Sequence, residues 1–106
     1  MANAKKEFLK HIGDRLVTCA KLNYGEFYND ETQEYETTHI NLPVSYTPEQ
    51  YQEFLTNLDF KYDDGYGGQN LFGNIWYNDG TWSSRSEYDG SEWWEYNKCP
   101  EIPKFN

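Results

Sequence analysis

Residues 63–96 read DDGYGGQNLFGNIWYNDGTWSSRSEYDGSEWWEY and contain all four tryptophans of the chain. A short unit recurs within them, YNDGTW at residues 77–82 and YDGSEW at residues 88–93. Asp-Gly between residues that favour strands is the strongest local signal for a β-hairpin. These residues therefore predict a three-stranded antiparallel meander.

The length of the second turn decides which side chains of the meander share a face. A two-residue loop at Asp89-Gly90 would set Glu87 opposite Glu92, a disfavoured like-charge pair. We therefore predict a three-residue loop, which sets Ser84 opposite Trp94, and a first turn that sets Trp76 opposite Trp82. A slip of one residue would exchange the two faces. The predicted core face carries Phe72, Trp76, Trp82, Trp94 and Tyr96, and the solvent face carries Leu71, Ile75, Ser83, Arg85, Trp93 and Glu95.

Length and composition predict one domain over residues 1–106, with a core built largely of aromatic residues. Aromatics make up 19% of the chain, and aliphatic residues are scarce. No apolar run reaches transmembrane length, and the first 15 residues lack the apolar centre of a signal peptide. A cytoplasmic location is therefore expected. In that compartment Cys19 and Cys99 are expected to be reduced, with a disulfide between them as the open alternative.

Charge is distributed unevenly along the chain. Residues 1–22 carry five basic and two acidic side chains, and residues 23–106 carry four basic and sixteen acidic ones, which gives the net charge of −9. A surface this acidic repels nucleic acid and anionic lipid, and it attracts a basic groove on another protein. Solubility alone is the alternative explanation.

The remaining elements complete an α+β prediction. A short helix over residues 3–11 is followed by a long hairpin with strands at 16–28 and 35–44, and Gly25 marks a bulge. Thr47, Pro48 and Gln50 form a capping box that begins a helix over residues 48–58. An extended segment at residues 60–62 and an extended tail after Asn97 are also expected.

The tip of the long hairpin is the predicted partner-binding site. It combines acidic side chains, which steer a basic partner, with tyrosines, which are favoured in protein interfaces. The candidate residues are Glu26, Tyr28, Asp30, Glu31, Glu34, Tyr35 and Glu36.

No catalytic residue, cofactor site or metal site is predicted. The glycines at residues 65–73 lack the Lys-Ser/Thr and the following helix of a phosphate loop. The Asp-Gly turns lack the regular oxygen spacing of a calcium loop, and the acids show no pairing that would indicate a glycosidase. Cys19 and His39 have no third residue spaced to complete a catalytic group. A non-enzymatic protein is expected.

The motifs FGNIWYNDGTW at 72–82, EYDGSEWW at 87–94 and PEIP at 100–103 resemble those of small uncharacterised proteins of tailed bacteriophages. The resemblance covers roughly the C-terminal half and carries no catalytic residue with it. It implies an accessory protein that acts in the cytosol of the infected cell. Such proteins often inhibit host or antiphage systems, including by occupying basic nucleic-acid-binding surfaces.

Two functions follow as expectations. The first is a protein that binds and inhibits or modulates a host or defence protein with a basic surface, without direct contact to nucleic acid or membrane. The second is a carbohydrate or small-ligand binding module that uses exposed aromatic residues. Recovery of a protein complex from bacterial lysate would favour the first, and binding to a glycan array would favour the second.

Overall fold

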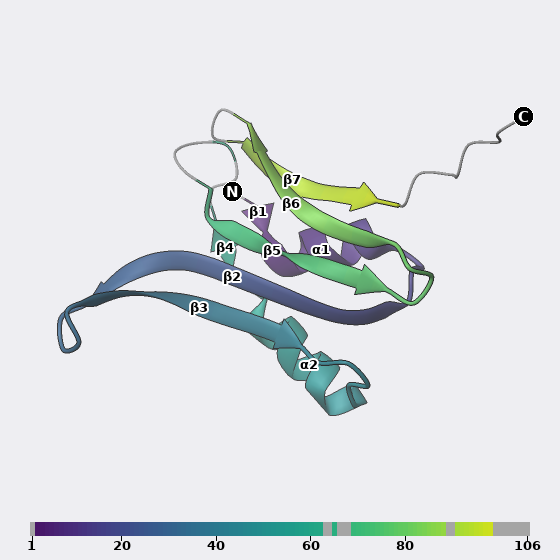
Figure 1. Ribbon diagram of the computed structural model, residues 1–106, viewed down its shortest axis with the longest axis horizontal. Helices are drawn as coiled ribbons and strands as arrows, with labels where there is room; N and C mark the ends of the chain where they lie inside the picture. The colour runs from purple at the N-terminus through teal and green to yellow at the C-terminus, as the bar shows by residue number, and fades with distance from the viewer. Residues whose placement is uncertain (1, 63–64, 66–68, 89–90, 99–106) are drawn as a thin grey trace, which may run out of the picture.

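The computed structural model describes residues 2–62, 65, 69–88 and 91–98, without the side chains of residues 26–29 and 35–36. Its main element is a five-stranded antiparallel sheet with the strand order β3-β2-β5-β6-β7 (Figure 1). The long hairpin and the meander are thus parts of one sheet, which confirms the predicted α+β class. The strands are β2 (Val17–Asn29), β3 (Glu34–Leu42), β5 (Leu71–Tyr77), β6 (Trp82–Tyr88) and β7 (Ser91–Asn97).

Both helices pack into a single core with one face of this sheet. The helices are α1 (Ala4–Ile12) and α2 (Pro48–Asn57), and their buried side chains join those of β2, β3 and β5 in one apolar cluster. A second, two-stranded sheet pairs β1 (Ala2–Asn3) with β4 (Lys61–Tyr62). Strand β4 lies at the extended segment expected from the sequence, whereas β1 was not expected, because two residues before a helix carry no strand pattern.

Helix α1 forms much as predicted. The side chain of Asn3 caps its first turn by accepting a hydrogen bond from the backbone N–H of Lys6. Phe8 and Ile12 are buried and form the apolar stripe of the helix, whereas Leu9 is 38% exposed. Gly13 ends the helix at a positive φ of 54°, and its N–H donates to the carbonyl oxygen of Leu9.

Helix α2 begins at the predicted capping box. The hydroxyl of Thr47 accepts from the N–H of Gln50 at 3.1 Å, and the side chain of Gln50 accepts from the N–H of Thr47 at 2.8 Å. Two backbone donors that the helix leaves free are thereby satisfied. Phe54, Leu55 and Leu58 then face the core, where Phe54 contacts Phe8 of α1 edge to face with ring centroids 5.2 Å apart.

The long hairpin contains the predicted bulge. Its register shifts between Tyr24 and Phe27, and Gly25 lies between them at a φ of 65°, in the left-handed region that favours glycine. The N–H of Gly25 donates to the carbonyl oxygen of Asn70 at 2.8 Å, which ties the hairpin to the segment that precedes β5.

The predicted loop between β6 and β7 is wrong by one residue. Tyr88 pairs with Ser91 and Glu87 with Glu92, so only two residues separate the paired positions. Trp94 therefore lies opposite Arg85 rather than Ser84. The predicted first turn is confirmed, because Trp76 lies opposite Trp82.

Because of this one-residue difference, β5 and β6 turn the opposite face to the core from the one predicted, whereas β7 turns the predicted face to the core. Trp94 is buried as predicted, with 7% of its surface exposed. The prediction is wrong for Trp76, which is 39% exposed, and for Phe72 and Tyr96, which are also exposed. Trp82 is partly buried on the side opposite the core, and Trp93 is exposed as predicted. The buried residues of β5 and β6 are instead Leu71, Ile75, Tyr77, Ser83 and the side chain of Arg85.

Pairing with β2 explains why β5 turns its odd-numbered residues to the core. Ala20 and Leu22 of β2 are buried, and they pair with Ile75 and Gly73 of β5. Directly opposite residues point to the same face of a sheet, so β2 places the odd-numbered residues of β5 in the core. The predicted tail, together with Cys99, lies outside the described residues. Cys19 is partly buried and forms no disulfide within the described part of the chain.

Candidate functional site

The β2–β3 hairpin extends beyond the other strands at one end of the sheet (Figure 1). Asp30, Glu31 and Glu34 at its turn are exposed. No lysine or arginine occurs between Lys21 and Lys61, so the hairpin contains no basic side chain of its own after Lys21. The end of the hairpin is therefore an acidic projection.

The structure places the backbone of every predicted partner-binding residue in this hairpin. Tyr28 lies directly opposite Tyr35, and Asn29 opposite Glu34. Opposite positions share a face, so the two tyrosine positions lie on the same side of the hairpin. The side chains of Glu26, Tyr28, Tyr35 and Glu36 lie outside the described part of the structure.

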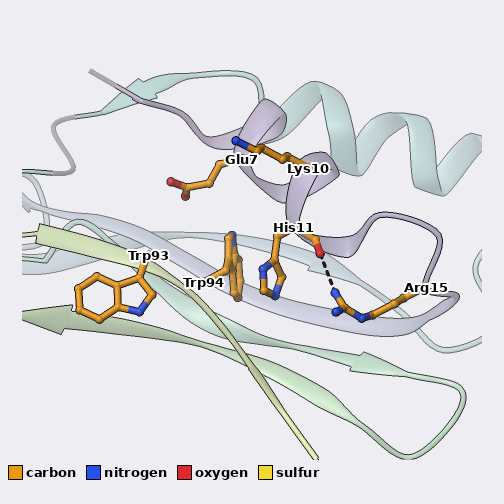
Figure 2. Close-up of a pocket in the computed structure, with 6 residues that line it drawn as sticks. All are labelled: Glu7, Lys10, His11, Arg15, Trp93 and Trp94. Atoms are coloured by element: carbon orange, nitrogen blue, oxygen red, sulfur yellow. Dashed lines mark hydrogen bonds between the residues drawn. The ribbon is translucent and has the colours of Figure 1, made fainter.

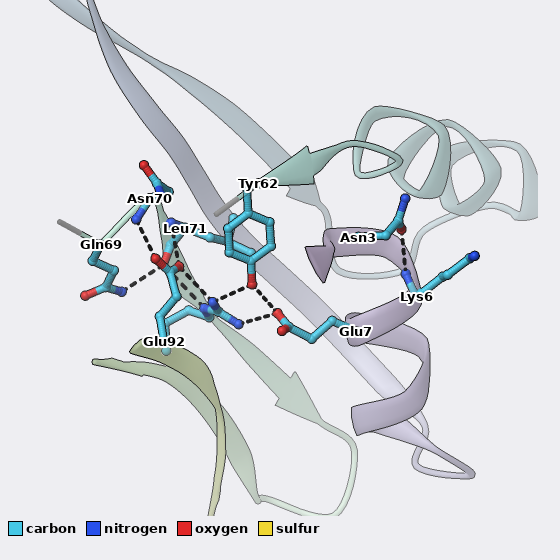
Figure 3. A network of polar contacts seen from close by, with 9 residues as sticks. Asn3, Lys6, Glu7, Tyr62, Gln69, Asn70, Leu71 and Glu92 are labelled. Atoms are coloured by element: carbon cyan, nitrogen blue, oxygen red, sulfur yellow. Dashed lines mark hydrogen bonds and ion pairs between the residues drawn. The ribbon is translucent and has the colours of Figure 1, made fainter. Parts of the chain in front are cut away.

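A buried ionic cluster holds α1, β6 and β7 together (Figure 3). The guanidinium of Arg85 on β6 is 1% exposed, and it donates to Glu92 at 2.8 Å and to Glu7 at 2.6 Å. It also donates to the hydroxyl of Tyr62, which in turn donates to Glu7. Glu92 accepts two further hydrogen bonds, from the backbone N–H groups of Asn70 and Leu71.

Burial and the hydrogen bonds within this cluster shift the pKa values of Arg85 and Tyr62. Burial by itself would lower the pKa of Arg85, but the hydrogen bond to Glu92 and the charge of Glu7 raise it. Burial raises the pKa of Tyr62 far above its usual value, and the hydrogen bond that it donates to Glu7 adds to this effect. Arg85 thus stays charged and fully engaged, which indicates a structural role rather than a catalytic one.

A hollow of about 510 Å³ lies between α1 and β7. His11 stacks on Trp94 with ring centroids 6.1 Å apart, and its Nε2 lies 2.7 Å from the hydroxyl oxygen of Ser83. Arg15 donates to the carbonyl oxygen of His11 and lies 3.9 Å from the ring centroid of Tyr96. Figure 2 shows the residues around the hollow, which are Glu7, Lys10, His11, Arg15, Trp93 and Trp94.

His11 should make the stability of the protein fall in mild acid. Burial lowers its pKa below the usual value, and the positive charges of Arg15 and Arg85 lower it further. Because the pKa of His11 is lower in the folded protein than in the unfolded chain, protonation favours unfolding. The contribution of neutral His11 to the free energy of unfolding is therefore fully present above a pH of about 6.5, and it is lost as the pH falls through the pKa of the folded protein.

Urea unfolding between pH 7.5 and 5.5 measures this effect. The free energy of unfolding of the wild-type protein should fall more steeply with acid than that of His11→Gln, which cannot take up the proton. Equal slopes for the two proteins would contradict the assignment to His11.

The second face of the sheet is covered by neither helix in the described part of the chain (Figure 1). Phe72 and Trp76 are 45% and 39% exposed on this face, and Trp82 lies directly opposite Trp76. The polar positions that share the face are Lys21, Asn23, His39, Asn41, Asn74 and Ser84. We call this surface the aromatic face.

Two hollows on the aromatic face share Lys21 and Trp76. The first, of about 400 Å³, lies between Phe72 and Trp76. The second, of about 260 Å³, lies between Trp76 and Val44. Because Lys21 and Trp76 border both, the two hollows adjoin each other at Trp76, and we refer to the pair as the depression.

Within the described residues, no group of three or more His, Cys, Asp or Glu side chains is placed to hold a metal ion. Cys19 and His39 share the aromatic face, but His39 pairs with Asn23, four residues along β2 from Cys19. Four strand residues span about 13 Å, which is too far for a catalytic dyad.

Comparison with protein-family models, with curated proteins and with solved structures finds no match to this chain. None of the helices that the structure describes is long and apolar enough to cross a membrane.

The sequence pattern does not predict the aromatic face, because it places Phe72 and Trp76 in the core. The signal that would have found it is the Asp89-Gly90 dipeptide, which favours a two-residue turn. The objection to that turn was the pairing of Glu87 with Glu92. It does not apply, because the carboxylate of Glu92 is neutralised by Arg85 and by two backbone donors.

Proposed function

We propose that this protein is a non-enzymatic binding protein that engages a basic surface of another protein through the acidic end of the β2–β3 hairpin. The observation that carries the proposal is the projection of this hairpin beyond the sheet with Asp30, Glu31 and Glu34 exposed at its turn (Figure 1). A projecting acidic turn can enter a groove on a partner, whereas a flat acidic surface cannot.

Electrostatics supports an encounter guided by this hairpin. The net charge of −12 over residues 23–106 contrasts with +3 over residues 1–22, so the molecule is strongly polarised along its sequence. Opposite charges accelerate association and orient the two partners before contact. A basic partner would therefore meet the hairpin first.

Tyrosine would supply the contacts that hold the partner after encounter. The positions of Tyr28 and Tyr35 lie opposite each other in the register, next to the acidic turn. Tyrosine buries a large ring at a low entropic cost and keeps a hydroxyl for hydrogen bonding, which makes it frequent among residues that dominate binding energy.

We further propose a biological setting for this binding, that of a small accessory protein of a tailed bacteriophage. In that setting the protein acts in the cytosol of an infected cell, and its partner is a host or antiphage-defence protein. A partner with a basic nucleic-acid-binding groove fits the charge of the hairpin, because carboxylates there would stand in for phosphates. Occupying the groove would inhibit the partner.

Capture from bacterial lysate, followed by association kinetics with the recovered protein, tests the proposal. Replacing Asp30, Glu31, Glu34 and Glu36 with their amides should slow association by about an order of magnitude at low salt. Association of the wild-type protein should also slow as salt rises, because ions screen exposed charges.

A matched variant separates the hairpin from net charge. It carries the same number of amide replacements at exposed acids elsewhere, namely Asp14, Glu49, Glu53 and Glu95. Its association rate should remain much closer to that of the wild-type protein. A partner whose association ignores both salt and the hairpin replacements would refute the electrostatic mechanism, and turnover of a substrate by the purified chain would refute the non-enzymatic assignment.

A further inference from the structure

We propose that the aromatic face is a binding site for a neutral carbohydrate, at the depression centred on Trp76. This site lies away from the acidic end of the β2–β3 hairpin and uses none of the partner-binding residues proposed there. It therefore does not depend on the protein-binding function proposed above.

The depression has aromatic walls. Phe72 and Trp76 lie four residues apart on β5, and both partly exposed residues line the 400 Å³ hollow. Gly73 also lines this hollow. A sugar ring has apolar C–H faces that pack on aromatic rings, and the hollow has the volume of an ordinary small-ligand site.

Polar side chains also line the same hollow. Asn23 and Asn74 offer amide donors and acceptors, and Lys21 offers an ammonium donor. His39 is held by a 2.6 Å hydrogen bond between its Nδ1 and the side-chain oxygen of Asn23, which fixes the orientation of both. Apolar walls combined with mixed donors and acceptors match a ligand whose hydroxyls both donate and accept.

The second hollow lengthens the site, so that it suits an oligosaccharide rather than a single sugar. It continues past Trp76 to Asn41 and Val44, the latter 65% exposed. Trp76 therefore contacts both halves of any ligand that spans the depression. This position makes it the residue whose loss should weaken binding most.

Charge selects a neutral sugar over other ligands that stack on aromatic rings. Lys21 is the only charged side chain among the described residues that line the two hollows, apart from the titratable His39. Single-stranded nucleic acid also stacks on aromatic platforms, but it requires a positively charged groove along its backbone, and this chain has a net charge of −9. A ligand without charge meets no such repulsion.

Tryptophan fluorescence titrations of the whole protein test the proposal. The probes are neutral hexasaccharides of β-1,4-linked glucose, mannose, xylose and N-acetylglucosamine and of α-1,4-linked glucose. At least one should bind saturably and perturb the side-chain amide NMR signals of Asn23 and Asn74. Trp76→Ala should weaken that binding about tenfold or more, and Trp76→Phe should retain part of it.

Leu9→Ala is the matched control, because Leu9 is 38% exposed on α1, away from the aromatic face. It should bind the saccharide as the wild-type protein does, and so should the hairpin amide variant. Failure of all five saccharides to bind would overturn the proposal. Binding of a 15-nucleotide single-stranded oligothymidine that Trp76→Ala abolishes would also overturn it, as would a dimer in sedimentation velocity that only the wild-type protein forms.

Discussion

Replacing Glu92 with glutamine should lower the free energy of unfolding by about 3–5 kcal/mol. The carboxylate of Glu92 is fully buried, and its loss would leave the guanidinium of Arg85, itself 1% exposed, with Glu7 as its only anionic partner among the described residues. Removing one member of a buried ion pair is strongly destabilising because the remaining charge is uncompensated. Urea unfolding at pH 7 measures the change as a shift of the midpoint with an unchanged slope.

Glu95→Gln is the control for the Glu92 variant, since Glu95 lies on the same strand but is exposed. Its effect should stay within about 0.5 kcal/mol. The double variant Arg85→Met/Glu92→Leu should recover part of the lost stability, because it leaves no unpaired guanidinium in the core. Recovery should be incomplete, because Glu7 loses an ion pair and the N–H groups of Asn70 and Leu71 lose their acceptor. Equal small effects of Glu92→Gln and Glu95→Gln would show that the buried cluster does not hold the fold.

Replacing Gly73 with alanine should have a comparable effect, of at least about 3 kcal/mol, or should prevent folding. A Cβ atom at Gly73 would lie 2.3 Å from the carbonyl oxygen of Lys21 and 2.8 Å from the Cα of Leu22. Both atoms belong to the backbone of β2, so no side chain can move aside to relieve the clash. Gly73 also adopts a φ of +143°, which residues with a side chain rarely adopt.

Gly80→Ala is the matched control, because Gly80 also has a positive φ, of +87°, but its added Cβ would meet nothing within 4 Å. It isolates backbone strain, on the order of 1–2 kcal/mol, from the clash with β2. Thermal unfolding of both variants gives the comparison. Similar losses for the two glycines would mean that the close approach of β5 to β2 is not what requires glycine at residue 73.

Glu92 and Gly73 stabilise the part of the fold that carries both proposed binding surfaces. The pairing of β2 with β5 is what joins the acidic hairpin to the meander in one sheet. Gly73 permits the close approach of these two strands, and the Arg85 cluster fixes β7 and the start of β5 against α1. The aromatic face depends directly on this junction, since its depression lies over β2 and β5.

Local signals in the sequence located both helices and the strands of the main sheet. The capping box at Thr47 and Gln50 begins α2 where predicted, because its hydrogen bonds involve neighbouring residues only. The Asp-Gly dipeptides locate the turns of the meander for the same reason. The uneven charge along the chain is likewise a property of the sequence, and it is the basis of the proposed acidic interface.

The tertiary structure alone decided which face of the meander is buried. Side chains alternate along a strand with a period of two, so Phe72 and Trp76 form as good an apolar face as Leu71 and Ile75. The choice was made by β2, whose buried Ala20 and Leu22 pair with β5, and by the ion pair that allows Glu92 to lie opposite Glu87. Both contacts join residues distant in sequence, and local patterns carry no information about such contacts. The aromatic rings were therefore left on the open face, where the proposed carbohydrate site lies.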